Sequence, residues 1–377
     1  MDAITRLARP EILAMKPYSS ARKEGEQHSI AVFLDANENP YPPFPADPAC
    51  EGLNRYPEPQ PQHLLDLFAA HYQADRDQLL ITRGADEAID LLVRAFCAAG
   101  SDAIVINTPT FGMYEISAQV QGARVHAIPL RHDDGFQLDT DAVLRVCRDD
   151  PACKLVFVCS PNNPTGALLR RDDILRLCAE LLGRSLVVAD ETYIEFTEQP
   201  SLASDIAAHP NLVVLRTLSK EYSLAGERCG TTIAHPEVVG IIGRILAPYP
   251  LTASAVRAVT RAMTPEGVAR ARANMRLLVQ QRKLLETALQ ASPAVTRVHP
   301  SDTNYLLIQT PAPELLLAMM QRAGIKIRDR SKVPGIEGCV RLTVGTPEQN
   351  QQVLEVFQEY AVRLLEDAGG PTIPARA

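Results

Sequence analysis

SLVVADETYIEF, residues 185–196, is the stretch that decides the fold, together with LVVLRTLSK, residues 212–220. Each begins with a run of β-branched and other apolar residues and ends in polar side chains. A continuous apolar run of this length is typical of a strand that is buried on both faces of a parallel sheet. Three earlier stretches have the same pattern, namely DQLLITRG (77–84), DAIVINTPT (102–110) and KLVFVCSPNNPTG (154–166).

Helix-like segments separate these runs, and the alternation predicts βαβ units and a mostly parallel sheet. In such a sheet a ligand lies beyond the carboxyl ends of the strands, so the polar residues after each run are candidates for a site. Beyond residue 250 the pattern changes to a long predicted helix and then to short strands in NYLLIQT, IKIRDR and CVRLTVGT. We therefore predict an α/β fold with an N-terminal arm (1–34), a large domain (35–250) and a smaller α+β C-terminal domain (251–377).

The composition excludes several classes of protein. The chain has 377 residues, of which 46% are apolar and 22% charged, and its net charge of −7 indicates neither nucleic acid nor an anionic membrane as a partner. No apolar run reaches the roughly 18 residues of a membrane span, and the N-terminus does not resemble a secretory signal. The eight cysteines show no CxxC pair and no metal-like spacing, so we expect reduced thiols in a cytoplasmic protein without a metal site.

The segment GADEAIDLLVRAFCAAG, residues 84–100, predicts a helix, because its apolar residues from Ile89 to Phe96 recur at helical spacing. Asp86 is the predicted N-cap and Gly100 the predicted C′ residue. The glycine that opens the segment would let a ligand approach the backbone closely, and the free N–H groups of the first turn would suit a phosphate. Taken alone, the segment favours a plain helix start that binds nothing.

The polar groups after the strands fit the needs of one cofactor. SPNNPTG places the amide of Asn163 after one strand, the next ends in Asp190 and Tyr193, and Lys220 follows the last. Pyridoxal phosphate requires an amine for its aldehyde, a carboxylate for its ring nitrogen, donors to its phenolate oxygen and a cationic nest for its phosphate. Each of these motifs taken singly is also typical of an ordinary turn or a solvated strand end.

The order and spacing of GADE, SPNNPTG, DETY, TLSK and AGERCG resemble the fold-type-I pyridoxal-phosphate-dependent aminotransferases. Within that superfamily, the chain is similar to the histidinol-phosphate aminotransferases from KPYSSAR to CVRLTVGT, roughly residues 15–350. The resemblance implies a mostly parallel seven-stranded sheet sandwiched by helices, plus the smaller C-terminal domain. It also implies transamination of L-histidinol phosphate with 2-oxoglutarate, which gives imidazole acetol phosphate and L-glutamate in histidine biosynthesis.

The same resemblance implies the cofactor-binding residues. Lys220 would form a Schiff base with the cofactor and shuttle a proton, Asp190 would bind the ring nitrogen, and Asn163 and Tyr193 would donate to the O3′ oxygen. Phe111 would stack on the ring. The phosphate would be bound by Gly84, Ala85, Asp86, Thr217, Ser219 and Arg228, and by Tyr56 of the second subunit in a homodimer whose active sites are shared across the interface.

Substrate-binding residues follow from the resemblance as well. Arg341 would bind the carboxylate of the amino and keto acids, and Arg328 with Tyr18 of the N-terminal arm would bind the phosphate of the substrate. Asn37 and Asn163 would complete this set. Without the resemblance, Arg328 reads as a surface charge on an edge strand.

Two acidic residues depart from the family pattern, because Glu221 follows Lys220 directly and Glu227 precedes Arg228. Either carboxylate would compete with the cofactor phosphate for Arg228 if it turned inward. We expect both side chains to face away from that arginine.

Three other functions remain open from the sequence. An aromatic-amino-acid aminotransferase or a threonine-phosphate decarboxylase would share nearly all of these motifs. A non-catalytic binding protein could also retain the fold, because function depends on the site and not on the fold alone. Amino-donor preference, release of carbon dioxide, and the presence of bound cofactor would distinguish these possibilities.

Overall fold

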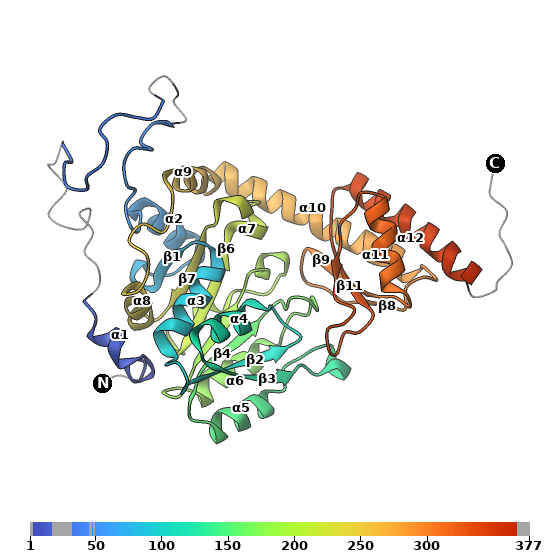
Figure 1. Ribbon diagram of the computed structural model, residues 1–377, viewed down its shortest axis with the longest axis horizontal. Coiled ribbons are helices and arrows are strands. Elements are labelled where there is room, and N and C mark those ends of the chain that lie inside the picture. Colours follow the sequence, from blue (N-terminus) through green and yellow to red (C-terminus); the bar gives the residue numbers. More distant parts are fainter. Residues whose placement is uncertain (1–2, 17–31, 45–46, 48–49, 368–377) are drawn as a thin grey trace.

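The computed structural model describes residues 3–16, 32–44, 47 and 50–367, and it contains two β-sheets that lie at opposite ends of a long helix (Figure 1). The larger sheet has seven strands in the order β1-β7-β6-β5-β4-β2-β3. Neighbouring strands from β3 to β6 are parallel, and β7 runs antiparallel to both β1 and β6. The strands are β1 Leu79–Thr82, β2 Ala103–Thr108, β3 Arg124–Pro129, β4 Cys153–Cys159, β5 Leu186–Asp190, β6 Leu212–Thr217 and β7 Gly230–Ala234.

This sheet confirms the predicted mostly parallel architecture, although the sequence patterns alone missed two of its strands. β3 lies at the edge of the sheet, and of its six residues only Ile128 is buried, so it lacks the apolar run that marks the central strands. β7 is fully buried but has the sequence GTTIA. Because two of its five residues are threonines, the apolar pattern of the sequence does not indicate this strand.

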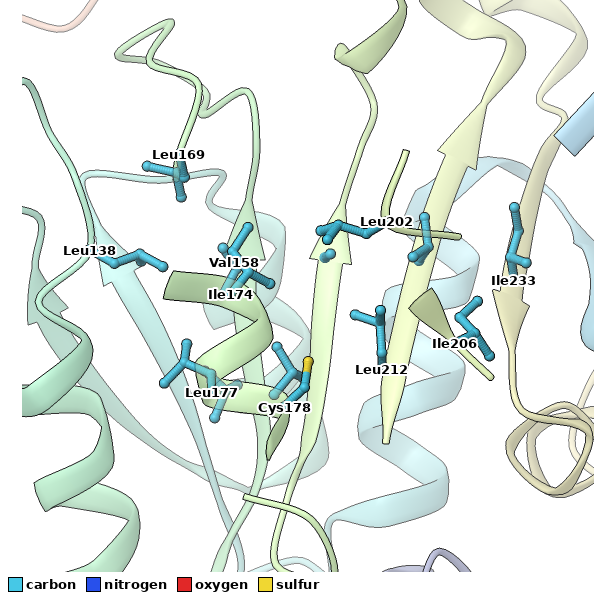
Figure 2. Close-up of a cluster of buried hydrophobic side chains, with 14 of the residues drawn as sticks. Leu138, Val158, Leu169, Ile174, Leu177, Cys178, Leu202, Ile206, Leu212 and Ile233 are labelled. Carbon is cyan, nitrogen blue, oxygen red and sulfur yellow. The ribbon is translucent and has the colours of Figure 1, made fainter. Parts of the chain in front are cut away.

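Side-chain alternation along the strands divides the core into two faces, because successive residues of a strand point to opposite sides. In β6, Leu212 and Val214 belong to one apolar cluster, whereas Val213 and Leu215 belong to the other. Figure 2 shows the first cluster, with side chains of α6 packed on the sheet. Its helices include α2 (Gln62–Tyr72), α5 (Thr140–Asp149) and α6 (Arg171–Glu180), and those of the second include α1 (Pro10–Ala14), α3 (Gly84–Phe96), α4 (Met113–Gln121) and α8 (Pro236–Gly243).

The smaller sheet is antiparallel and has the order β10-β11-β9-β8. One face is covered by α11, α12 and the C-terminal part of α10, whereas Leu307 and Cys339 on the opposite face join the first core cluster of the large sheet. That opposite face therefore looks toward the large sheet. The elements are α9 (Ala253–Ala262), α10 (Pro265–Gln290), β8 (Arg297–His299), β9 (Tyr305–Gln309), α11 (Pro313–Arg322), β10 (Arg328–Asp329), β11 (Cys339–Thr343) and α12 (Pro347–Asp367).

Helix α10 passes from the large sheet to the small one, as expected for the predicted connector (Figure 1). The domain limits at residues 34 and 250 stay predictions. None of the described helices is both long and apolar enough to cross a membrane.

Both predicted caps of α3 are wrong. The helix begins at Gly84, so Asp86 lies in its first turn, and it ends at Phe96 with Cys97 as the C-cap, well before Gly100. The start is earlier because the Glu87 carboxylate accepts the backbone N–H of Arg83 at 2.6 Å, which satisfies a free donor at the helix end. Consequently the side chain of Asp86 is free to turn toward the site.

Candidate active site

A cavity of about 350 Å³ lies where the carboxyl ends of β4, β5 and β6 meet the inner face of the small sheet. This is the place that the strand order predicts for a ligand. Residues of both sheets line it: Ala85, Asp86, Phe111, Cys159, Asn163, Asp190, Thr192, Tyr193, Thr217, Ser219, Lys220, Arg228, Arg328, Arg330 and Arg341.

All but four of the predicted site residues line this cavity. Gly84 lies directly behind it, since a Cβ atom there would come within 2.9 Å of Arg228 Nη2. Asn37 is exposed and Tyr56 is half-exposed and stacked on Tyr249, with ring centroids 4.4 Å apart, and neither reaches the cavity of its own chain. Tyr18 lies outside the described residues.

Asp190 is a buried carboxylate at the end of β5, with 3% of its surface exposed. The Tyr114 hydroxyl donates to Oδ2 at 2.7 Å, and Thr192 donates its backbone N–H (3.0 Å) and its hydroxyl (2.6 Å) to Oδ1. Burial raises the pKa of Asp190, while the hydrogen bonds from Thr192 and Tyr114 lower it. No cationic side chain among the described residues forms an ion pair with it, although Lys220 of the same cavity interacts with it electrostatically.

Lys220 is carried by α7 (Leu218–Glu221), a single helical turn that follows β6 directly. The Thr217 hydroxyl caps this turn by accepting the backbone N–H of Ser219 at 3.2 Å. Burial lowers the pKa of the Lys220 ammonium, and the positive charges of Arg341 and Arg228 lower it further. A lysine in this environment gives up its proton more readily than a solvated one, which suits a nucleophile or a base.

An anion-binding corner forms where α3 begins beside Arg228. The guanidinium donates to Ser219 Oγ at 3.4 Å and to Asp86 Oδ2 at 3.1 Å. Gly230 of β7 allows this close packing, because a Cβ atom there would lie 2.7 Å from the carbonyl carbon of Gly84. The first N–H groups of α3, one hydroxyl and one arginine thus converge, although an anion bound here would compete with Asp86 for Arg228.

Arg341 connects the small sheet to the SPNNPTG turn. Its Nη1 donates to Asn163 Oδ1 at 2.6 Å, and its guanidinium carbon lies 5.2 Å from the centroid of the Tyr305 ring. Tyr305 in turn donates its hydroxyl to the backbone oxygen of Asn162 at 2.7 Å. Because Arg341 occupies the amide oxygen of Asn163, the amide nitrogen of Asn163 is the atom left to donate into the cavity.

These groups fit pyridoxal phosphate by the chemistry of their donors. Asp190 is a buried acid that forms no ion pair with any residue in the described part of the chain, and a protonated pyridine nitrogen would supply such a partner. Lys220 would reach the aldehyde, Asn163 and Tyr193 would donate to the ring oxygen, and the corner at Arg228 would hold the phosphate.

Comparison with known proteins identifies the family. Residues 29–357 match the family described as aminotransferase class I and II. The chain belongs to the class I and II aminotransferases. A histidinol-phosphate aminotransferase of Pectobacterium atrosepticum is 41% identical over 358 residues, which are 95% of this aminotransferase and 98% of that relative.

Two solved structures share the fold of this aminotransferase. The histidinol-phosphate aminotransferase from Sinorhizobium meliloti, in complex with pyridoxal-5'-phosphate, has a TM-score of 0.73 at 21% identity, covering 94% of this chain and 97% of that one. The L-threonine-O-3-phosphate decarboxylase from Porphyromonas gingivalis has a TM-score of 0.70 at 26% identity, covering 82% and 91%. The predicted resemblance to fold-type-I aminotransferases is confirmed.

Five site residues of this aminotransferase were missed by the sequence reasoning, and one of them, Cys159, lines the cavity at the end of β4. Tyr114 lies in α4, far from Asp190 along the chain, and no local pattern links the two. Tyr305 is likewise joined to the site only by the packing of the small sheet. Thr192 and Arg330 could have been found, because each lies only two residues from a predicted site residue, Asp190 and Arg328.

Glu221 faces away from Arg228, as expected. Its carboxylate is 5% exposed and accepts from Arg216 Nη2 at 3.4 Å. Arg216 also pairs with Glu195, and its Nη1 lies 3.7 Å from Glu191 Oε2, so three carboxylates share one buried guanidinium. Within the described part of the chain, Glu227 forms no ion pair with Arg228. The Arg228 guanidinium instead donates to Ser219, Asp86 and the Ala225 carbonyl.

Replacing Glu221 by glutamine should flatten the pH dependence of stability of the aminotransferase. Burial raises the pKa of Glu221 to about 8 although Arg216 lowers it, whereas the unfolded chain would show the ordinary value of 4.5. Between these values the folded state binds the extra proton, so the unfolding free energy should fall as pH rises, by at most about 1.4 kcal/mol per pH unit. Melting temperatures measured from pH 5.5 to 8.5 would test this expectation.

The matched control for this measurement is Glu359→Gln, which removes an exposed carboxylate from α12. It should leave the pH dependence of the melting temperature unchanged. A Glu221→Gln variant with the same pH dependence as the unsubstituted protein would show that Glu221 does not hold the extra proton.

Proposed function

We propose that this protein transfers the amino group of L-histidinol phosphate to 2-oxoglutarate with pyridoxal phosphate as cofactor, forming imidazole acetol phosphate and L-glutamate. The observation that carries the proposal is the cavity itself, which is lined by Lys220, by several arginines and by Asp190, a buried acid with no ion pair to any described residue. Relatives that are 40–41% identical over nearly the whole chain are histidinol-phosphate aminotransferases, which supports the choice of substrate. The step belongs to histidine biosynthesis.

Pyridoxal phosphate, when bound, supplies an aldehyde that takes up the amino group and a ring that withdraws electrons from the reacting carbon. Lys220 would take the proton from Cα of the amino donor and deliver it to the carbon of the cofactor that had been the aldehyde, and its lowered pKa favours its role as the base. Tyr114 and Thr192 hold Asp190 in place, and Asp190 would keep the ring nitrogen protonated. The amide nitrogen of Asn163 would donate to the ring oxygen.

Arg341 binds the carboxylate of 2-oxoglutarate and of the L-glutamate formed from it. A guanidinium presents two parallel N–H groups to a carboxylate, and the contacts with Asn163 and Tyr305 hold this one in a single orientation. Phe111 lines the cavity wall and offers a ring face for stacking. Binding and orientation by these fixed groups are expected to supply much of the rate acceleration.

The test of this function is a visible absorbance spectrum of the purified protein before and after addition of L-histidinol phosphate without a keto acid. We expect a yellow band that disappears on addition and returns with 2-oxoglutarate. A band that responds to phenylalanine and not to L-histidinol phosphate would instead indicate an aromatic-amino-acid aminotransferase. Carbon dioxide released from threonine phosphate would indicate a decarboxylase, and a protein that stays colourless with added cofactor would indicate a binding protein.

We further propose a homodimer with shared active sites, located in the cytoplasm. The described part of residues 32–56 exposes six large apolar side chains, and free thiols at all eight cysteines are the state that a reducing compartment maintains. A second copy that covered this segment would bring Tyr56 to the phosphate corner of its partner. The exposed apolar side chains are Val32, Leu34, Tyr41, Phe44, Leu53 and Tyr56.

Mixing two weakened variants should restore activity if the sites are shared. A Lys220→Ala subunit still provides Tyr56, and a Tyr56→Ala subunit still provides Lys220, so a mixed dimer contains one complete site. After joint unfolding and refolding, we expect activity well above that of either variant refolded alone. Activity that does not rise, although the mixed dimer is detected by affinity tags, would contradict the shared site.

A further inference from the structure

Potential metal ligands gather at the end of the large sheet that lies opposite the cavity. Cys153 is the first residue of β4, the strand whose last residue lines the cavity, and His126 lies in the first half of β3. Both strands pair with β2, where Ala103 is opposite Cys153 and Val105 is opposite His126. Ala103, Val105 and Cys153 belong to one core cluster, so His126 projects from the same face of the sheet.

The C-terminal end of α5 adds two more groups on this face. Cys147 lies in the last turn of α5 and Asp150 is its C-cap. The thiols of Cys147 and Cys153 interact with each other, and Asp150 Oδ2 lies 2.8 Å from His126 Nε2. One potential ligand atom from each of His126, Asp150 and Cys153 lies within 4.8 Å of the other two. Side chains from two strands and the end of one helix therefore converge.

These groups match the ligands that zinc prefers. Zinc sites in proteins are commonly tetrahedral and combine thiolates, imidazoles and carboxylates, whereas magnesium and calcium prefer oxygen ligands. With bonds of about 2.0–2.3 Å, the ligand atoms of a tetrahedral site lie roughly 3.3–3.8 Å apart. Atoms within 4.8 Å of one another would reach that spacing by closing in by about 1 Å.

The cluster is buried at its sulfur atoms and accessible at its other two ligands. Cys147 and Cys153 are each 2% exposed, whereas the side chains of His126 and Asp150 are 32% and 21% exposed. An ion can therefore enter from solvent at the imidazole and the carboxylate and reach the thiols beneath them. The backbone N–H of Ala152 donates to Asp150 Oδ1 at 3.1 Å and so helps to orient this carboxylate.

The charge of the cluster is compatible with a divalent ion. Arg124 donates to both oxygens of Asp150, at 2.8 and 3.3 Å, and its side chain is half exposed, so it can release one oxygen to a metal. Two thiolates and one carboxylate carry three negative charges, which one divalent ion and this guanidinium would neutralise. Binding breaks two S–H bonds and forms two metal–sulfur bonds, and both thiol protons pass to solvent.

A second group of potential ligands, His71, Glu195 and Glu221, is less suitable. Its ligand atoms also lie within 4.8 Å of one another. However, the Arg216 guanidinium already pairs with both carboxylates, and its positive charge would repel a metal ion placed between them. We therefore assign the metal to the group that contains the two thiols.

We infer that Cys147, Cys153, His126 and Asp150 form a site for one zinc ion, remote from the proposed active site. The ion would tie the edge strand β3 and the end of α5 to the start of β4, so it would act on stability and not on turnover. The inference is independent of the proposed function. The cysteine spacing predicted no metal site because the ligands come from three elements and not from one short motif.

The test titrates the untagged holoenzyme, kept reduced by a phosphine, first with cobalt(II) and then with zinc(II). Cobalt bound to thiolates in a tetrahedral site absorbs strongly at red wavelengths, where the yellow cofactor does not absorb. We expect this band to saturate at one cobalt per subunit and to disappear when zinc replaces the cobalt. With zinc at about a hundredfold excess over its Kd, the melting temperature should rise by about 2–5 °C.

Two variants test the ligands themselves. Cys153→Ala and His126→Gln should each weaken binding of cobalt and zinc by about tenfold or more, and both should lose the rise in melting temperature with zinc. His126→Gln changes a partly exposed side chain of an edge strand, so it remains informative if the buried Cys153→Ala variant does not fold.

Two matched controls locate the metal. Cys178→Ala removes another buried thiol of the same core cluster, and His71→Gln removes the imidazole of the second group of ligands. Both should bind cobalt and zinc as the unsubstituted protein does. The inference would be overturned by a protein that shows no red band with cobalt, by a band that persists unchanged in His126→Gln, or by a band that is lost in His71→Gln instead.

Discussion

Replacing Lys220 by alanine should reduce transamination by about a thousandfold or more. The variant loses the only amine among the described residues that lines the cavity, and with it the group that moves the proton at the reacting carbon. The yellow band of bound cofactor should also change in position, because the lysine no longer joins to the aldehyde. Steady-state rates with L-histidinol phosphate and 2-oxoglutarate, together with the absorbance spectrum, measure both effects.

Lys283→Ala is the matched control for this substitution, because it removes an exposed lysine of α10. It should retain the rate and the spectrum of the unsubstituted enzyme. A Lys220→Ala protein that keeps its melting temperature but loses activity would locate the defect in the chemistry. Undiminished turnover by Lys220→Ala would refute the role of this lysine.

Replacing Asp190 by asparagine should lower kcat about a hundredfold to a thousandfold. The amide has nearly the size of the carboxylate but carries no charge, so it cannot stabilise a protonated ring nitrogen at a buried position. The asparagine amide would also place an N–H group beside Tyr114 and Thr192, which are themselves donors and need an acceptor at this position. Rates should be measured at saturating cofactor, so that weaker cofactor binding is not mistaken for slower chemistry.

Tyr114→Phe serves as the comparison for Asp190→Asn. It removes one of the three hydrogen bonds to Asp190 and leaves the charge in place, so we expect a loss of tenfold or less. The contrast between the two variants separates the charge of Asp190 from its positioning. An Asp190→Asn enzyme within about threefold of the unsubstituted rate would mean that the ring nitrogen needs no carboxylate here.

Local sequence patterns predicted the central parallel strands of the large sheet, but they did not predict all of its strands or the ends of α3. The apolar runs of β4, β5 and β6 predicted buried strands because the chain must be apolar on both faces there. The same patterns did not predict β3, because it is an exposed edge strand. They did not predict β7 either, because it contains threonines whose burial depends on the neighbouring strands. The predicted N-cap of α3 was wrong because Glu87, and not Asp86, satisfies the backbone at the start of that helix.

The sequence alone determined which chemistry is available and roughly where. Lys220, Asp190 and Asn163 each follow a predicted strand, and the parallel order of those strands brings them to one edge of the sheet. Only the tertiary structure decided which partners surround them. Tyr114 reaches Asp190 across 76 positions of the chain and Arg341 reaches Asn163 across 178, and contacts of such separation depend on the packing of helices and sheets that no local pattern encodes.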